Sequence, residues 1–69
     1  MKKKEADQVV SEMEPLGYDH VQPVYATLNN GTRTWLVSCV SPVDEKLHVF
    51  RYTSEWDNVK QKHHAEVTQ

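Results

Sequence analysis

An Asn-Gly pair at residues 30 and 31 separates two runs rich in β-branched and aromatic residues, at residues 21–28 and 32–40. Asn-Gly is a preferred centre for a two-residue type I′ turn, because the twist of that turn matches the twist of the flanking strands. The alternation of apolar and polar residues in both runs is typical of β-strands. The sequence therefore predicts a β-hairpin over residues 21–40.

A two-residue turn at Asn30-Gly31 would set the register of this hairpin, since every residue outward from the turn then has one defined partner. The expected partners are Leu28 with Arg33, Ala26 with Trp35, and Val24 with Val37. One face of the sheet then carries apolar side chains interrupted only by Arg33: Val24, Ala26, Leu28, Trp35, Val37 and Cys39. We expect this face to be the core. A slip of one residue would expose Trp35 and Val37 to solvent, so this register is strongly preferred.

Cys39 is the single cysteine of the chain and lies on the expected core face. A nucleophilic cysteine needs a nearby base and an electropositive, partly exposed setting, whereas a thiol on an apolar strand packs as a small hydrophobic group. We therefore interpret Cys39 as a packing residue. One cysteine allows no disulfide within the chain, and no apolar stretch predicts a signal peptide or a membrane span, so we expect a cytoplasmic location.

A helix is predicted before the hairpin. Ala6, Val9, Val10 and Met13 recur at the spacing of one helix face. Pro15 clashes with the carbonyl group four residues earlier in a helix, so the helix should end near Met13 or Glu14.

A third strand and a second helix are predicted after the hairpin. Residues 47–53 have the composition of a strand, in which Leu47 and Val49 point to the core in the orientation that we favour. The opposite orientation instead buries the ring side chains, which are His48, Phe50 and Tyr52. Ser54 is a candidate N-cap for a helix over residues 55–66. The inner stripe of that helix would be Trp56, Val59 and His63.

These elements predict a single domain over residues 1–69 of the α+β class. The expected architecture has two layers in the order α-β-β-β-α, with a three-stranded antiparallel sheet and both helices on one face. A chain of 69 residues buries only about 60% of the surface that its unfolded form exposes, so a deep catalytic cleft is not expected.

This order of elements resembles the double-stranded-RNA-binding domain and the HicA-type toxin, over the whole chain and in layout alone. The RNA-binding family carries a Gly-Pro-x-His signature in its first hairpin loop and lysines at the start of its last helix. At these places this chain has Asn-Asn-Gly-Thr at residues 29–32 and Glu-Trp-Asp at residues 55–57. The toxin family has Gly-Ser-His on its first strand, where this chain has Val-Gln-Pro-Val at residues 21–24. The resemblance therefore implies a shared layout and no membership.

No residue pattern of the sequence predicts catalysis. It contains no Gly-rich phosphate loop, no Ser/His/Asp spacing and no pair of carboxylates arranged for acid–base chemistry. His63 and His64 are neighbours on the predicted helix, so they point about 100° apart and do not chelate a metal together. We predict no enzyme activity, no cofactor and no metal site.

The leading hypothesis is a small non-catalytic interaction protein that regulates or blocks a larger partner, of the kind found among bacterial and phage accessory proteins. If both helices cover the core face, the second face of the sheet stays open, and an exposed apolar patch marks a contact site. We expect this face to bind another protein or a second copy of the chain. Its predicted contact residues are Tyr25, Leu36, Val40, Phe50 and Tyr52.

The alternative hypothesis is nucleic-acid binding similar to that of the double-stranded-RNA-binding domain. The net charge of −2 does not favour it, because affinity for nucleic acid comes largely from neutralised phosphates. A local basic face would be needed. Its candidate residues are Lys2, Lys3, Lys4, Arg33, Arg51, Lys60 and Lys62.

Overall fold

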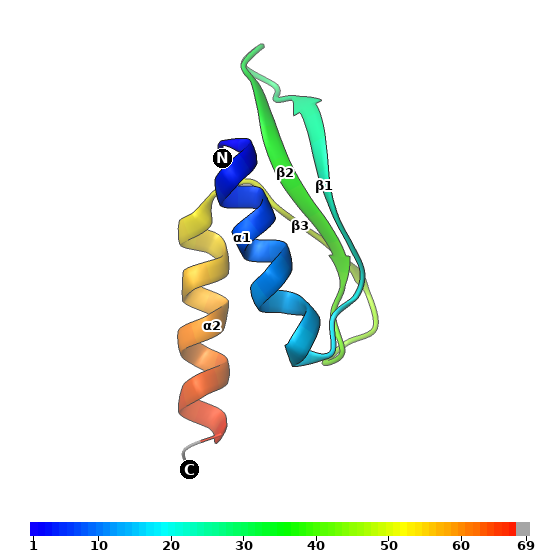
Figure 1. Ribbon diagram of the computed structural model, residues 1–69, viewed down its shortest axis with the longest axis vertical. Coiled ribbons are helices and arrows are strands. Elements are labelled where there is room, and N and C mark those ends of the chain that lie inside the picture. Colours follow the sequence, from blue (N-terminus) through cyan, green and yellow to red (C-terminus); the bar gives the residue numbers. More distant parts are fainter. Residues whose placement is uncertain (68–69) are drawn as a thin grey trace.

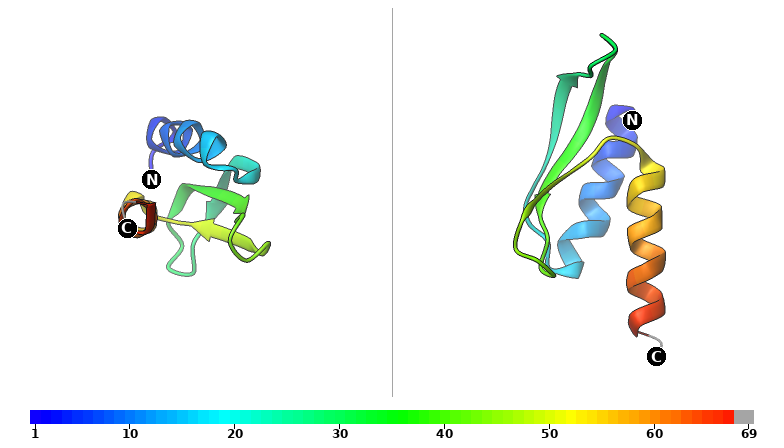
Figure 2. Two further views of the ribbon diagram at one scale, coloured as in Figure 1. Left: turned by 90° about the horizontal axis from the view of Figure 1, so that it is seen from below. Right: turned by 180° about the vertical axis from the view of Figure 1, so that it is seen from behind.

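The computed structural model describes the backbone of residues 1–67 and the side chains of residues 1–62. Two helices and a three-stranded antiparallel sheet form an α+β domain, which confirms the predicted fold class (Figure 1). The elements are α1 (Lys3–Met13), a 3₁₀ turn η1 (Glu14–Leu16), β1 (Asp19–Thr27), β2 (Arg33–Val40), β3 (Leu47–Phe50) and α2 (Thr53–Val67). The strand order is β1-β2-β3, and both helices lie on one side of the sheet (Figure 2).

Helix α1 follows its sequence pattern. Ala6, Val9 and Met13 are buried, and they form the stripe that faces the sheet and α2. The chain leaves the helix through η1, which contains Pro15, and then turns at Gly17. Gly17 has φ of 88°, a left-handed conformation that glycine adopts without the steric cost of a Cβ atom. The predicted helix stop is therefore confirmed.

The hairpin is confirmed, but its predicted register is wrong by one residue. Thr27 pairs with Arg33, and the N–H of Leu28 donates to the carbonyl of Thr32 at 2.8 Å. The N–H of Gly31 donates to the carbonyl of Leu28 at 2.9 Å, and Gly31 alone in the turn has a positive φ, of 87°. This is the geometry of a three-residue loop whose last residue is left-handed, whereas a type I′ turn needs two positive φ angles.

The extra loop residue changes which side chains of β1 face the helices. Trp35 pairs with Tyr25 instead of Ala26, so Tyr25 lies on the helix side of the sheet. Val24 and Ala26 consequently point to the opposite face. The prediction for β2 is correct, because Val37 and Cys39 are fully buried under the helices.

The favoured orientation of the third strand is also wrong. Phe50 pairs with Val37 and His48 pairs with Cys39, so these two rings lie on the helix side and Leu47 and Val49 face outward. Packing explains the result. Phe50 is buried against Trp56, with ring centroids 6.0 Å apart, and fills space that the smaller Val49 would leave empty.

Helix α2 begins at Thr53, two residues before the predicted start. The carbonyl of Tyr52 accepts the N–H of Glu55 at 3.1 Å, so Ser54 lies inside the first turn and is not the N-cap. Trp56 is buried and Val59 packs against the core, as predicted, while the side chain of His63 lies outside the described residues. The buried apolar core of the described residues consists of Ala6, Val9, Met13, Val37, Cys39, Phe50 and Trp56.

Candidate functional site

The face of the sheet that points away from both helices is an apolar surface that the fold leaves uncovered (Figure 2). Alternation along the strands places six apolar residues on it: Val24, Ala26, Leu36, Val40, Leu47 and Val49. Ser38 lies among them on the central strand. Direct cross-strand pairs join Val24 to Leu36, Ser38 to Val49 and Val40 to Leu47. These seven residues are called the open sheet face below.

The open sheet face combines exposure with little charge. Val24 is 38% exposed, Val49 44% and Leu47 68%, and the other members are half-buried by their neighbours. Three polar residues hold the remaining outward positions of the paired strands: Gln22 and Thr34 are uncharged, and Asp19, opposite Val40 at the start of β1, is acidic. A continuous apolar patch with a single acidic residue at its border differs from the scattered apolar residues found on most protein surfaces.

The five residues predicted to bind a partner do not share one face. Leu36 and Val40 belong to the open sheet face. Tyr25 and Phe50 lie on the helix side, and Phe50 is part of the core. Tyr52 is exposed in the connection between β3 and α2. The signal that would have corrected the placement of Tyr25 is the Asn29-Asn30-Gly31 triplet, which also suits a three-residue loop with glycine last.

A second candidate site joins two aromatic rings and two cations at the start of α1. The ring centroids of Tyr25 and Trp35 are 5.1 Å apart, with an angle of 47° between the ring planes. The Arg33 guanidinium carbon lies 5.0 Å from the centre of the Tyr25 ring, and Lys3 Nζ lies 5.2 Å from the Trp35 ring. These rings and cations line a surface cavity of about 490 Å³. The rest of its lining is Met1, Lys2, Glu5 and Thr34. We call Lys3, Tyr25, Arg33 and Trp35 the cation–aromatic cluster.

The basic residues of the nucleic-acid hypothesis lie in several separate places. Three of them line the cavity of the cation–aromatic cluster: Lys2, Lys3 and Arg33. Lys4 is exposed on the first turn of α1, and Arg51 lies near the end of the hairpin. Lys60 pairs with a carboxylate of α1, and Lys62 lines a cavity beside the turn before β3. The structure therefore gathers three of the seven predicted residues at one cavity.

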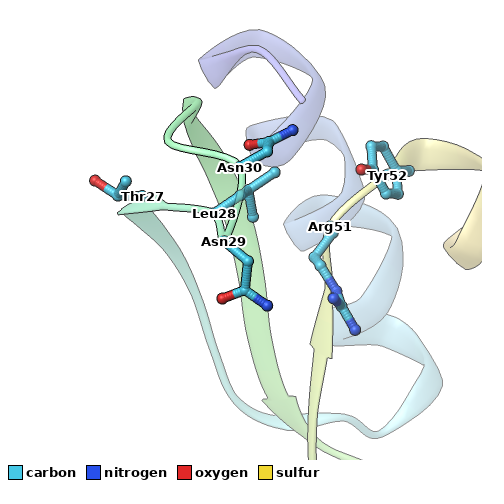
Figure 3. Close-up of a pocket in the computed structure, with 6 residues that line it drawn as sticks. All are labelled: Thr27, Leu28, Asn29, Asn30, Arg51 and Tyr52. Atoms are coloured by element: carbon cyan, nitrogen blue, oxygen red, sulfur yellow. The ribbon is translucent and has the colours of Figure 1, made fainter.

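Arg51 belongs to a cavity of about 300 Å³ between the hairpin end and the connection from β3 to α2 (Figure 3). Asn29 and Asn30 border it on the hairpin side, and Arg51 and Tyr52 on the other. Its polar groups suit a small anion, with one guanidinium to supply charge and amide groups to donate hydrogen bonds. These side chains are exposed, so water screens the charge of Arg51 strongly.

One group of neighbouring side chains has the residue types of a catalytic cysteine site, in which a base activates a thiol. These residues are Cys39, His48 and Asp44. Cys39 and His48 are a direct cross-strand pair, and His48 Nε2 lies 2.9 Å from Asp44 Oδ2. However, Cys39 is fully buried, and burial raises the pKa of its thiol. Among the described side chains, no hydrogen bond joins the thiol to His48. A nucleophilic thiolate needs the opposite environment, so this arrangement supports the packing interpretation of Cys39.

Glu12 connects the two helices. Its carboxylate accepts a hydrogen bond from Trp56 Nε1 at 2.7 Å and from Lys60 Nζ at 3.1 Å. The bond from Trp56, followed by the bond from Lys60, lowers the pKa of Glu12. Lys60 also lies 3.5 Å from Asp57 on its own helix. Lys60 is thus engaged in holding α2 against α1.

Among the described residues, no group of three His, Cys, Asp or Glu side chains is placed to hold a metal ion. Within the same part of the chain, no helix has the length and apolar character needed to cross a membrane. Comparisons with protein-family models, curated proteins and solved structures found no match.

Proposed function

We propose that this chain is a small non-catalytic regulatory protein that acts by binding a protein on its open sheet face. The observation that carries the proposal is the continuous apolar surface over three strands, on the side of the sheet away from both helices. Burial of apolar surface is favourable by about 25 cal/mol per Å². Covering this face therefore supplies the main driving force for association that the fold offers.

The chemistry of the open sheet face favours a protein partner. Nucleic acids and anionic membranes are recognised through positive charge, and the one ionisable residue at the outward positions of the paired strands, Asp19, is acidic. A protein surface with its own apolar patch is the complementary partner. Regulation by contact fits the absence of an accessible nucleophile at Cys39, because such a protein acts through the surface that it covers on its partner.

Site-specific photo-crosslinking in the cells that produce the protein tests this function. A benzophenone amino acid replaces Leu36 or Val49 on the open sheet face, and Gln8 or Val43 elsewhere as controls. Val43 is a matched control because it is 80% exposed and apolar but lies in the turn before β3. We expect a discrete protein adduct from Leu36 and Val49 only, identified by mass spectrometry. Adducts confined to the control positions, or no adducts, would contradict the proposal.

Single-stranded nucleic acid is a second candidate ligand, favoured by the cation–aromatic cluster. Proteins that bind single strands combine aromatic rings, on which bases stack, with cations that contact phosphates. Tyr25 is half-exposed and has Arg33 beside it, and Lys2 and Lys3 line the same cavity. The glutamate in that cavity, Glu5, and the 3.1 Å ion pair between Lys3 and Asp7 reduce the local positive charge.

Fluorescence anisotropy with a labelled oligonucleotide at two salt concentrations tests the second candidate. Phosphate binding must weaken steeply as salt rises. Replacing Arg33 by Ala should weaken binding, whereas the control variant Lys46→Ala, at an exposed position just before β3, should not. Absence of binding at low salt, to single strands and to duplexes alike, would exclude nucleic acid as the ligand.

A further inference from the structure

The hairpin loop contains two neighbouring residues that can react with each other. Asn30 is followed by Gly31 at the exposed tip between β1 and β2 (Figure 1). The amide carbon of an asparagine side chain can be attacked by the backbone nitrogen of the next residue, because this attack closes a five-membered ring. A Cβ atom on the next residue crowds the approach, and glycine has none. Of the three asparagines in the chain, only Asn30 precedes a glycine.

The loop holds the side chain of Asn30 across Gly31. Asn30 Oδ1 accepts the N–H of Thr32 at 3.0 Å, and Thr32 is the residue after Gly31. Because the nitrogen of Gly31 lies between these two bonded groups along the chain, the hydrogen bond keeps the amide carbon near the nitrogen that attacks it. The N–H of Thr32 also stabilises the negative charge that develops on Oδ1 during the attack, as the donors of an oxyanion hole do. No atom lies within 4 Å of a Cβ built on Gly31, so the ring has room to form.

One hydrogen bond of the loop opposes the reaction. The N–H of Gly31 donates to the carbonyl of Leu28 at 2.9 Å, and the nitrogen must lose this proton before it attacks. The bond lies at the exposed tip of the hairpin, where hydrogen bonds open locally without unfolding of the domain. The folded protein therefore needs only one local opening before the two groups can react.

We propose that Asn30 is a site of spontaneous covalent modification in the folded protein. The backbone nitrogen of Gly31 gives up its proton and bonds to Cγ of Asn30, and the side-chain nitrogen takes up a proton and leaves as ammonia. Water, the only co-reactant, then adds to either carbonyl of the resulting succinimide ring and breaks the C–N bond at that carbonyl. One opening gives aspartate. The other gives isoaspartate, in which the main chain runs through the side-chain carbons.

Both products change the cavity that Asn30 lines together with Arg51 (Figure 3). Each product adds one carboxylate to a chain whose net charge is −2. A carboxylate and a guanidinium attract each other and form charge-assisted hydrogen bonds. Isoaspartate also adds one atom to the main chain of a three-residue loop. The modification therefore supplies a cavity that suits a small anion with an anion from the chain itself.

Peptide mass spectrometry tests the proposal on folded protein stored for weeks in weakly alkaline or weakly acidic buffer, with pepsin digestion in acid to prevent conversion during preparation. We expect aspartate and isoaspartate to accumulate at residue 30, faster in the alkaline buffer because Gly31 must lose a proton. Asn29 and Asn58 are internal controls, because both are exposed but precede residues with a Cβ atom. Gly31→Ala should slow the conversion by roughly ten-fold or more, because the rate falls exponentially as the Cβ raises the barrier.

The variant Glu12→Ala distinguishes reaction in the folded loop from reaction in unfolded molecules. Glu12 lies near the end of α1 that is far from the hairpin tip (Figure 1). Loss of its bonds to Trp56 and Lys60 should raise the unfolded population by up to roughly 30-fold. We expect Asn30 to convert at an unchanged rate in this variant. A parallel rise in the conversion rate overturns the proposal. It is also overturned by absence of conversion at Asn30, by equal conversion at the control asparagines, or by undiminished conversion in Gly31→Ala.

Discussion

Replacing Glu12 by Ala should loosen the contact between α1 and α2 and destabilise the whole domain. The Trp56 side chain is buried, and its indole N–H donates to Glu12 at 2.7 Å. Among the described residues, no buried side-chain nitrogen or oxygen lacks a partner. Among the described residues Glu12 is the only acceptor for Trp56 Nε1, so the variant leaves a buried donor without a hydrogen bond.

The size of this effect follows from the two interactions that Glu12 makes. A buried donor that loses its partner costs about 1–3 kcal/mol, and hydrogen bonds to charged groups lie at the upper end. The ion pair with Lys60 adds less than about 1 kcal/mol, because its side chain is 41% exposed and water screens it. We therefore expect a loss of about 2 kcal/mol. In a domain of this size that loss lowers the melting temperature by about 10 °C.

Urea unfolding followed by circular dichroism measures the effect in a double-mutant cycle with Trp56→Phe. Glu12→Gln is the matched control, because its amide oxygen still accepts from Trp56 while the negative charge is gone. It should cost less than half as much as Glu12→Ala. In the Trp56→Phe background, Glu12→Ala should cost about 1–2 kcal/mol less, because no buried donor remains to be satisfied. A coupling energy near zero, or equal losses for Gln and Ala, would refute this role of Glu12.

Three further predictions concern one residue each, namely Glu12, Cys39 and Gly31. Because hydrogen bonds from Trp56 and Lys60 lower the pKa of Glu12 below 4.5, its contribution to stability is complete above that pH and is lost as pH falls through the folded-state pKa. The difference in urea midpoint between the original protein and Glu12→Gln should therefore shrink from pH 7 toward acid, and a constant difference would contradict this. Cys39 is fully buried, so thiol reagents should label it slowly in native buffer and rapidly in urea; fast native labelling would contradict the packing role. Gly31→Ala should lower the free energy of unfolding in urea by about 1 kcal/mol, because alanine is strained at the φ of 87° while no atom lies within 4 Å of its Cβ. Gly31→Asn should lower it less, because asparagine tolerates the left-handed conformation better. An unchanged urea midpoint for Gly31→Ala would contradict a left-handed residue at this position.

Local signals in the sequence determined the elements that depend on neighbouring residues. The stripe of Ala6, Val9 and Met13 set the buried side of α1, and Pro15 with Gly17 ended it. Composition and spacing also located the hairpin and the buried side of β2. These predictions succeeded because helix periodicity, strand alternation and proline geometry act within a few residues of the chain.

The arrangement of the candidate site depended on contacts between distant residues. The sequence predicted an uncovered apolar face, and Leu36 and Val40 were correctly placed on it. The rest of that face changed when Gly31 took the third position of the loop and shifted β1 by one residue. Asn-Asn-Gly is compatible with both loops, and the choice between them depends on which side chains of β1 pack best.

The orientation of β3 and the cation–aromatic cluster were decided by tertiary structure alone. Phe50 faces the helices because its ring packs against Trp56, which lies on α2, the helix that follows β3 in the sequence. Lys3 reaches Trp35 only because α1 lies across the hairpin. A short strand has two faces of similar hydrophobicity in its sequence, and only the shape of the space beneath the helices distinguishes them, since a core must be filled without voids.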